Sequence, residues 1–155
     1  MRKALIFIAP GAILAAIIWV VFQLPRVDAR LGTMLPAWAV VPGVLLVTAG
    51  ASLVIACAGI LTIEGRGTPF VLNPTSEFVA AGPYRYTRNP LYVGQVELLI
   101  GAGLSLQSSA VLLFALAWFG CLHLFVVSWE EPDLTKRFGG TYQAYCKTVP
   151  RWPSL

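Results

Sequence analysis

Long apolar segments with almost no charged residues are the feature that most restricts what this chain can fold into. The segments run approximately over Ala4–Leu24, Trp38–Ile63, Leu91–Leu106 and Ser108–Trp129. At about 1.5 Å per helical residue, the first, second and fourth can cross a hydrocarbon core of about 30 Å. The third is short, and we expect it to form a compact hairpin with the fourth. The sequence therefore predicts an all-α, polytopic integral membrane protein with about four transmembrane helices.

The distribution of basic residues predicts how the chain is oriented. Only 12% of its 155 residues are charged, and 11 of these are Lys or Arg. With both termini in the cytoplasm, nine of the 11 lie on the inner side and only Arg26 and Arg30 lie outside. Because cytoplasmic segments carry the excess of Lys and Arg, we expect an N-in, C-in topology. The net charge of +4 then reflects topology and attraction to anionic lipids, and no basic soluble face indicates nucleic-acid binding.

The first apolar segment resembles a signal peptide in two respects. It follows Arg2 and Lys3, and Val27-Asp28-Ala29 is similar to a small-residue cleavage site. Its apolar core exceeds the roughly 7–15 residues of a signal peptide, so we expect an uncleaved anchor.

The three cysteines show no metal-ligand spacing. They are Cys57 and Cys121, within apolar segments, and Cys146, near the end of the chain. We expect all three to be packing residues, and no metal site.

The chain shows no linker that would separate independent domains, so we expect a single membrane domain over residues 1–155. Residues 1–63 read as two scaffold helices, and residues 64–155 as a loop, a helical hairpin and a tail that form the functional core. Prolines at positions 69, 74, 83 and 90 prevent a long helix over Glu64–Asn89. We expect an ordered loop there, because long loops are usually functional or disordered and the aromatic residues argue against disorder.

A basic, aromatic motif precedes the third apolar segment, and an acidic pair follows the fourth. The motif is Gly82-Pro83-Tyr84-Arg85-Tyr86-Thr87-Arg88-Asn89-Pro90-Leu91-Tyr92-Val93-Gly94, and the pair is Glu130-Glu131 after Trp129. A hairpin brings the two together at the membrane surface. The rings and carboxylates suit a cationic ligand, and the arginines suit a carboxylate or phosphate. The alternative is that these arginines and tyrosines are interfacial anchors.

A helical run over Thr141–Lys147 follows the acidic pair, with Tyr142 and Tyr145 three positions apart. It is amphipathic enough to lie at the interface. Two interpretations stay open: a lid that covers the cleft, or a plain membrane-surface anchor.

Glu97 and His123 are the ionisable residues deep inside the last two apolar segments. Each lies seven positions from its cytoplasmic end, so both are expected at a depth of about 10 Å. We expect the two side chains to come within hydrogen-bonding reach, directly or through one water. Such a pair either locks the hairpin or lines a polar cavity wall.

Together, the motif G-P-Y-R-Y-T-R-N-P-L-Y-V-G, the pair E-E before F-G-G-T-Y-Q-A-Y and a final V-P-R resemble a known family over residues 69–151. This is the group of membrane-embedded S-adenosylmethionine-dependent methyltransferases that includes isoprenylcysteine carboxyl methyltransferases and phospholipid N-methyltransferases. The resemblance implies a cofactor between the last two spans and a lipidic substrate that enters from the bilayer. The cofactor-binding residues it implies are Ser76, Glu77, Phe78, Val79, Tyr84, Asn89, Pro90, Leu91, Tyr92 and Glu130.

Two positions depart from the pattern of that family. Asn89 stands where the family has a histidine before proline, and asparagine does not titrate near neutral pH. Val126 stands where isoprenylcysteine enzymes have an arginine that holds the substrate carboxylate. For catalysis we expect Arg88 to hold an anionic group and Glu131 to act as a base if the acceptor is an amine.

The sequence thus predicts S-adenosylmethionine-dependent methyl transfer to a hydrophobic acceptor, as in isoprenylcysteine carboxyl methyltransferases. One alternative is phospholipid amine N-methylation. The other is a non-catalytic membrane protein that binds lipid or a partner.

Overall fold

A computed structural model of the chain describes residues 2–67 and 75–153, with side chains from residue 12 onward. Residues 68–74 of the predicted loop therefore lie outside the described part. The helices are α1 (Arg2–Leu31), the 3-10 turn η1 (Ala37–Ala39), α2 (Val40–Ile63), the 3-10 turn η2 (Gly82–Arg85), α3 (Pro90–Ser105), α4 (Ser109–Phe125), the π-helical segment η3 (Val126–Glu130) and α5 (Glu131–Thr148). The described residues form no strand beyond one isolated bridge, which confirms the all-α prediction.

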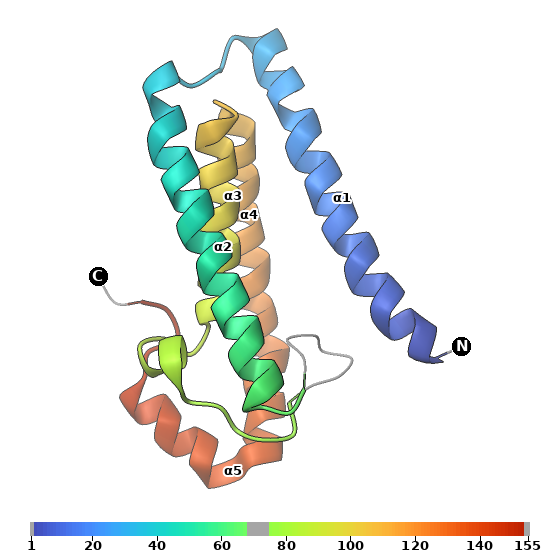
Figure 1. Ribbon diagram of the computed structural model, residues 1–155, viewed down its shortest axis with the longest axis vertical. Helices are drawn as coiled ribbons and strands as arrows, with labels where there is room; N and C mark the ends of the chain where they lie inside the picture. The colour runs from blue at the N-terminus through green and yellow to red at the C-terminus, as the bar shows by residue number, and fades with distance from the viewer. Residues whose placement is uncertain (1, 68–74, 154–155) are drawn as a thin grey trace.

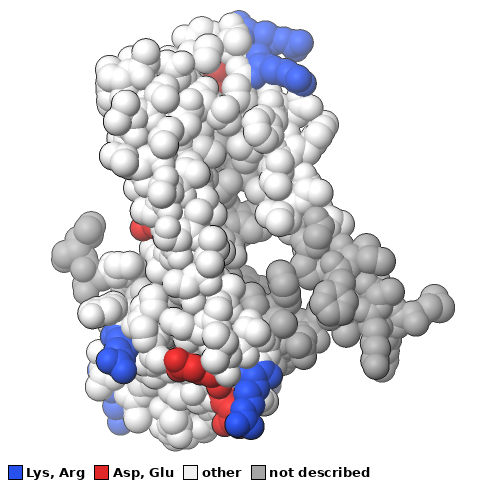
Figure 2. Space-filling model, in the orientation of Figure 1, with Lys and Arg blue, Asp and Glu red and all other residues white. Residues whose placement is uncertain are grey.

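Within the described residues, three helices are long and apolar enough to cross a membrane: α1, α2 with η1, and the helix that begins with α4. The fourth predicted span, α3, has 16 residues and so a length of about 24 Å. It lies beside α2 and α4 in the bundle, whereas α1 leans away from them toward its N-terminal end (Figure 1). Charged side chains gather at the two ends of the face seen in Figure 2, with a mostly uncharged band between them. The membrane architecture is confirmed, but a count of four full-length spans is not.

Close backbone contact through glycines joins α2 to α3. A Cβ atom added to Gly43 would lie 2.9 Å from the carbonyl oxygen of Gly101, and one added to Gly50 would lie 2.7 Å from that of Gly94. In both helices the two glycines are seven positions apart, so they share one helix face. Small residues allow helix backbones to approach this closely.

The first helix is longer than the apolar pattern predicted. It continues past Leu24 to Leu31, with Pro25 inside it. Asp28 in its last turns is 1% exposed and accepts hydrogen bonds from Ser109 Oγ at 2.8 Å, from the amide of Ala110 at 3.2 Å and from the Ser108 hydroxyl. A carboxylate is favourable at a helix N-terminus, so Asp28 attaches α1 to the start of α4. The helix therefore extends beyond the apolar run, which ends near Leu24.

The chain turns sharply at Gly139, inside α5. This glycine has φ 53° and ψ −127°, a conformation that residues with a side chain rarely adopt. The second half of α5 therefore doubles back under the bundle (Figure 1). The N-terminal end of α1 and the last described residues both lie toward the end of the bundle that carries α5.

Candidate active site

A cavity lies where α3 begins and α4 passes into α5. Its walls come from α2, the loop before α3, the first turn of α3, the end of η3, and α5. The lining residues are Leu61, Thr75, Phe78, Val79, Tyr84, Arg88, Asn89, Leu91, Tyr92, Trp129, Glu130, Glu131, Asp133, Leu134, Arg137, Phe138, Tyr142 and Tyr145. Aromatic and aliphatic side chains with a few charged groups suit a ligand that has both a ring system and polar ends.

Most of the predicted site residues meet in this cavity. Those among its lining are Phe78, Val79, Tyr84, Asn89, Leu91, Tyr92 and Glu130, together with the two predicted catalytic residues, Arg88 and Glu131. Ser76, Glu77 and Pro90 are not. Pro90 is fully buried, and the backbone amides of Ser76 and Glu77 both donate to the carbonyl oxygen of Gly65, at 2.9 and 3.2 Å. The role of each of these residues toward a cofactor stays a prediction.

Glu130 connects the end of the fourth span to the start of the third. The hydroxyl of Tyr92 donates a 2.8 Å hydrogen bond to Glu130 Oε2. Tyr92 lies in the first turn of α3, which begins at Pro90 because a proline at the first helical position leaves no donor unsatisfied. The bond places the Glu130 carboxylate in the cavity wall.

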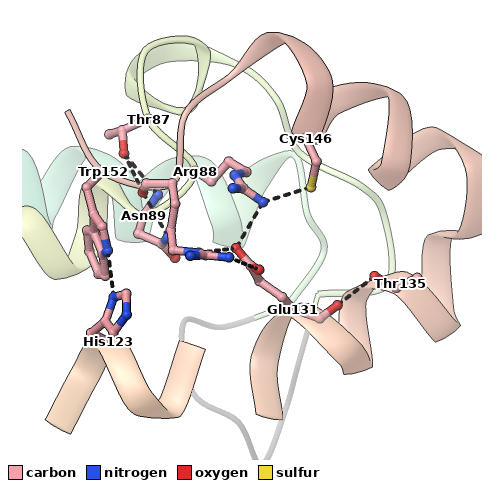
Figure 3. Close-up of polar contacts among 9 residues, drawn as sticks. Thr87, Arg88, Asn89, His123, Glu131, Thr135, Cys146 and Trp152 are labelled. Carbon is pink, nitrogen blue, oxygen red and sulfur yellow. Dashed lines mark hydrogen bonds and ion pairs between the residues drawn. The ribbon is translucent and has the colours of Figure 1, made fainter. Parts of the chain in front are cut away.

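Glu131 is bound by two arginines from distant parts of the chain (Figure 3). Arg151 contacts it with two parallel bonds, from Nε to Oε1 and from Nη2 to Oε2, both 2.8 Å long. Arg88 Nη1 lies 2.9 Å from Oε1. The hydrogen bonds from Arg151 lower the pKa of Glu131 below its ordinary value, and the charge of Arg88 acts in the same direction against the effect of burial.

One hydrogen-bond donor of Arg88, its Nε–H, is buried and unpaired among the described residues. Its Nη1 also lies 2.9 Å from Cys146 Sγ, but its Nε is buried without a hydrogen-bond partner in the part of the chain that the structure describes. A buried unpaired donor is costly, and Arg88 lines the cavity. The donor is therefore suited to an anionic or carbonyl group of a ligand.

The predicted lid helix covers the cavity with aromatic rings. Phe138, Tyr142 and Tyr145 of α5 line it, and Phe78 of the loop packs against Phe138 at 5.5 Å and Tyr145 at 5.2 Å between ring centroids. The hydroxyl of Tyr145 donates to the carbonyl oxygen of Tyr84 at 2.5 Å. Burial raises the pKa of Tyr145 to about 12, so it remains a neutral donor at physiological pH. Of the two interpretations left open for this run, the lining residues favour the lid.

Among the described residues, Glu97 and His123 make no direct hydrogen bond to each other. His123 Nδ1 instead accepts a 3.0 Å hydrogen bond from the indole N–H of Trp152, and the ring of Phe119 lies 5.0 Å from that indole. Glu97 lies on the α2 side of α3, since its Cβ would be 3.0 Å from a Cβ added to Gly50. The prediction of a direct pair was wrong, because equal depth in the membrane does not fix the direction in which each side chain points.

The cysteines differ from one another. Cys57 is fully buried against Tyr84 and Leu91, which confirms its packing role. Cys121 is exposed on α4, and Cys146 is half-buried in contact with Arg88, so the packing role expected for these two stays a prediction.

Sequence reasoning missed several residues of the site. Arg137 and Phe138 lie in the cavity wall, and Arg151 holds Glu131 without reaching the cavity. The final V-P-R motif was the signal that pointed to Arg151. The residues after Thr148 show no periodic pattern that would place them beside α3.

The chain is similar in sequence to a known protein family. A sequence model described as phospholipid methyltransferase matches residues 38–141, which is 104 of the 155 residues. The match begins just before α2 and ends in α5, so it includes the glycine-packed helix pair and both acidic residues. No curated protein and no solved structure matches the chain.

Proposed function

Because the chain belongs to the phospholipid methyltransferase family, we propose that it is a membrane enzyme that transfers a methyl group from S-adenosylmethionine to a hydrophobic, lipid-like acceptor. The observation that carries the proposal is the position of Glu130. Its carboxylate is bonded to Tyr92 in an aromatic cavity that is lined by α2, the start of α3 and the junction of η3 with α5. The family match includes both residues.

The residues of the cavity fit the proposed cofactor. Leu61, Val79 and Tyr84 offer apolar and aromatic surface for a nucleobase. Glu130 accepts hydrogen bonds from hydroxyl or ammonium groups, and the free Nε of Arg88 donates to a carboxylate. When bound, S-adenosylmethionine supplies an electrophilic methyl group on a sulfonium. The protein's own part is to align the acceptor with that group and exclude water, because displacement reactions gain most from orientation.

Arg88 and Glu131 remain the proposed catalytic residues, but the role proposed for Glu131 changes. As a base for an amine acceptor Glu131 is weak, because two arginines lower its pKa. We propose that it instead holds the Arg88 guanidinium, which contacts the anionic part of the cofactor or acceptor.

Two acceptor classes follow from different observations. The family description supports a phospholipid amine. The buried Nε of Arg88 in the cavity wall supports a carboxylate acceptor, as in isoprenylcysteine methylation, although the arginine of those enzymes is replaced by Val126, which is fully buried here. For orientation, the count of nine basic residues against two supports cytoplasmic termini and a cytoplasmic site.

The proposal is tested in two steps. Calorimetry of the purified protein in detergent with S-adenosylhomocysteine should show binding, and absence of binding would favour a non-catalytic lipid- or partner-binding protein. Labelled methyl transfer into a lipid extract, followed by identification of the labelled species, then separates an amine product from a methyl ester.

A further inference from the structure

The structure assigns a positioning role to Arg151, which we infer to hold the Arg88 guanidinium in place through Glu131. The inference rests on the proposed function. Arg151 belongs to a short segment, Pro150–Trp152, that we call the clasp. The clasp lies beyond the residues matched by the family model, which end at 141.

The backbone of the clasp fixes the segment that leads into α3. The amide of Arg88 donates to the carbonyl oxygen of Pro150 at 2.9 Å. The carbonyl oxygen of Arg151 accepts two bonds, from Thr87 Oγ1 at 2.9 Å and from Asn89 Nδ2 at 3.0 Å. Three consecutive residues at the mouth of the cavity are thus tied to one short segment more than 60 positions away, as Figure 3 shows for Thr87 and Asn89.

The side chain of Arg151 acts on the site indirectly, through Glu131. It does not line the cavity, but both oxygens of Glu131 are bound by it, and Oε1 also faces Arg88. Glu131 therefore lies between a guanidinium outside the cavity and one in its wall. A planar guanidinium with two parallel bonds fixes the plane of a carboxylate, which a lysine cannot do.

The far end of the clasp is anchored on α4. The indole of Trp152 donates to His123, and its ring packs against Phe119. These contacts fix the residue that follows Arg151. The loop, α4 and α5 are consequently joined at a single segment, and the direction of Arg88 depends on it.

The inference can be tested with Arg151→Ala, Arg151→Lys and a control that removes one nearby positive charge, Lys147→Ala. Lys147 is exposed in the last turn of α5. In the methyl-transfer assay we expect kcat of Arg151→Ala to fall by about 10- to 100-fold, since a misplacement of about 1 Å costs on that order. Arg151→Lys should lie between Arg151→Ala and wild type, and Lys147→Ala should match wild type.

Two readouts separate positioning from a general disruption of the structure. Without Arg151 the pKa of Glu131 rises, so the acid limb of the pH–rate profile should move to higher pH in Arg151→Ala and stay in place in Lys147→Ala. Added guanidinium ion should restore part of the rate of Arg151→Ala, because the position is partly open to solvent. An unshifted profile together with no rescue would overturn the inference.

A third readout does not need activity. Hydrogen exchange in detergent should show the Arg88 amide protected in wild type and Lys147→Ala, and less protected in Arg151→Ala. If wild type neither binds S-adenosylhomocysteine nor transfers methyl groups, the proposed function fails. Hydrogen exchange of the Arg88 amide then still tests whether the clasp holds the segment before α3. Equal protection in all variants would overturn the clasp, whatever the activity.

Discussion

Replacing Gly101 by alanine should separate α2 from α3. A Cβ atom at this position would lie 2.6 Å from the amide nitrogen of Val47 and 2.8 Å from the carbonyl oxygen of Gly43, whereas ordinary van der Waals distances begin at 3.4 Å. The obstructing atoms belong to the backbone, so no side-chain rotation relieves the overlap. The helices must move apart by several tenths of an ångström.

The energetic cost arises because van der Waals attraction between the two helices weakens as they separate. A gap of about 0.5–1 Å removes a quarter to a half of the roughly 0.1–0.2 kcal/mol that each atom pair contributes. Over a few tens of atom pairs the cost is on the order of 1–3 kcal/mol, which agrees with the usual cost of overpacking. Alanine also favours the helix over glycine by about 1 kcal/mol, and this gain must be removed by a control.

Gly59→Ala is the matched control. Gly59 lies inside α2, and a Cβ there meets nothing within 4 Å. Reversible unfolding in mixed micelles should show Gly101→Ala less stable than Gly59→Ala by about 1–3 kcal/mol, since helix propensity cancels between them. Adding Gly43→Ala to Gly101→Ala should cost less than it does alone, because the helices are already apart. Equal stability of Gly101→Ala and Gly59→Ala would refute the close-packing argument.

Three further predictions concern carboxylates. Glu130→Ala and Tyr92→Phe should each weaken S-adenosylhomocysteine binding in calorimetry, Glu130→Ala by about 1–3 kcal/mol, and unchanged affinity in both would remove the cofactor from this cavity. Asp28→Asn removes a charge from the start of α4 and should lower the free energy of unfolding by about 1–3 kcal/mol without changing that affinity. The lowered pKa of Glu131 means that its ion pairs stabilise the folded state above the ordinary glutamate pKa of about 4.3 and that this contribution is lost as pH falls through the folded-state value. Melting temperatures followed from neutral to acidic pH should therefore fall less steeply for Glu131→Gln, and parallel curves would contradict the assignment.

The helices and much of the cavity were predictable because hydropathy and proline positions report on backbone requirements. Pro90 marks the start of α3, and the apolar run up to Ile63 ends where α2 ends. Glu130 and Tyr92 were placed at one site by their resemblance to a family motif, and the structure joins them at 2.8 Å.

What was missed depends on information that periodicity does not contain. Asp28 follows the apolar stripe, so its burial required knowledge of the α3–α4 turn that receives it. His123 was given the wrong partner because depth in the bilayer fixes one coordinate and leaves the rotation of the helix free. Arg151 and Trp152 reach the site because the chain changes direction at Gly139 and brings the C-terminal segment back beside α4.

The π-helical segment Val126–Glu130 changes how residues must be counted across the junction of α4 and α5. Its wide turn carries one residue more than an α-turn, and the amide of Glu131 bonds to the carbonyl oxygen of Val126, five positions earlier. If residues are counted at 3.6 per turn from α4 into α5, the helix faces predicted for α5 are therefore shifted by one residue from those that it has. A chain without the π-turn would need one residue fewer between the last span and the acidic pair to keep both carboxylates in the same places. An alignment of such a chain with this one needs a gap of one residue at the junction.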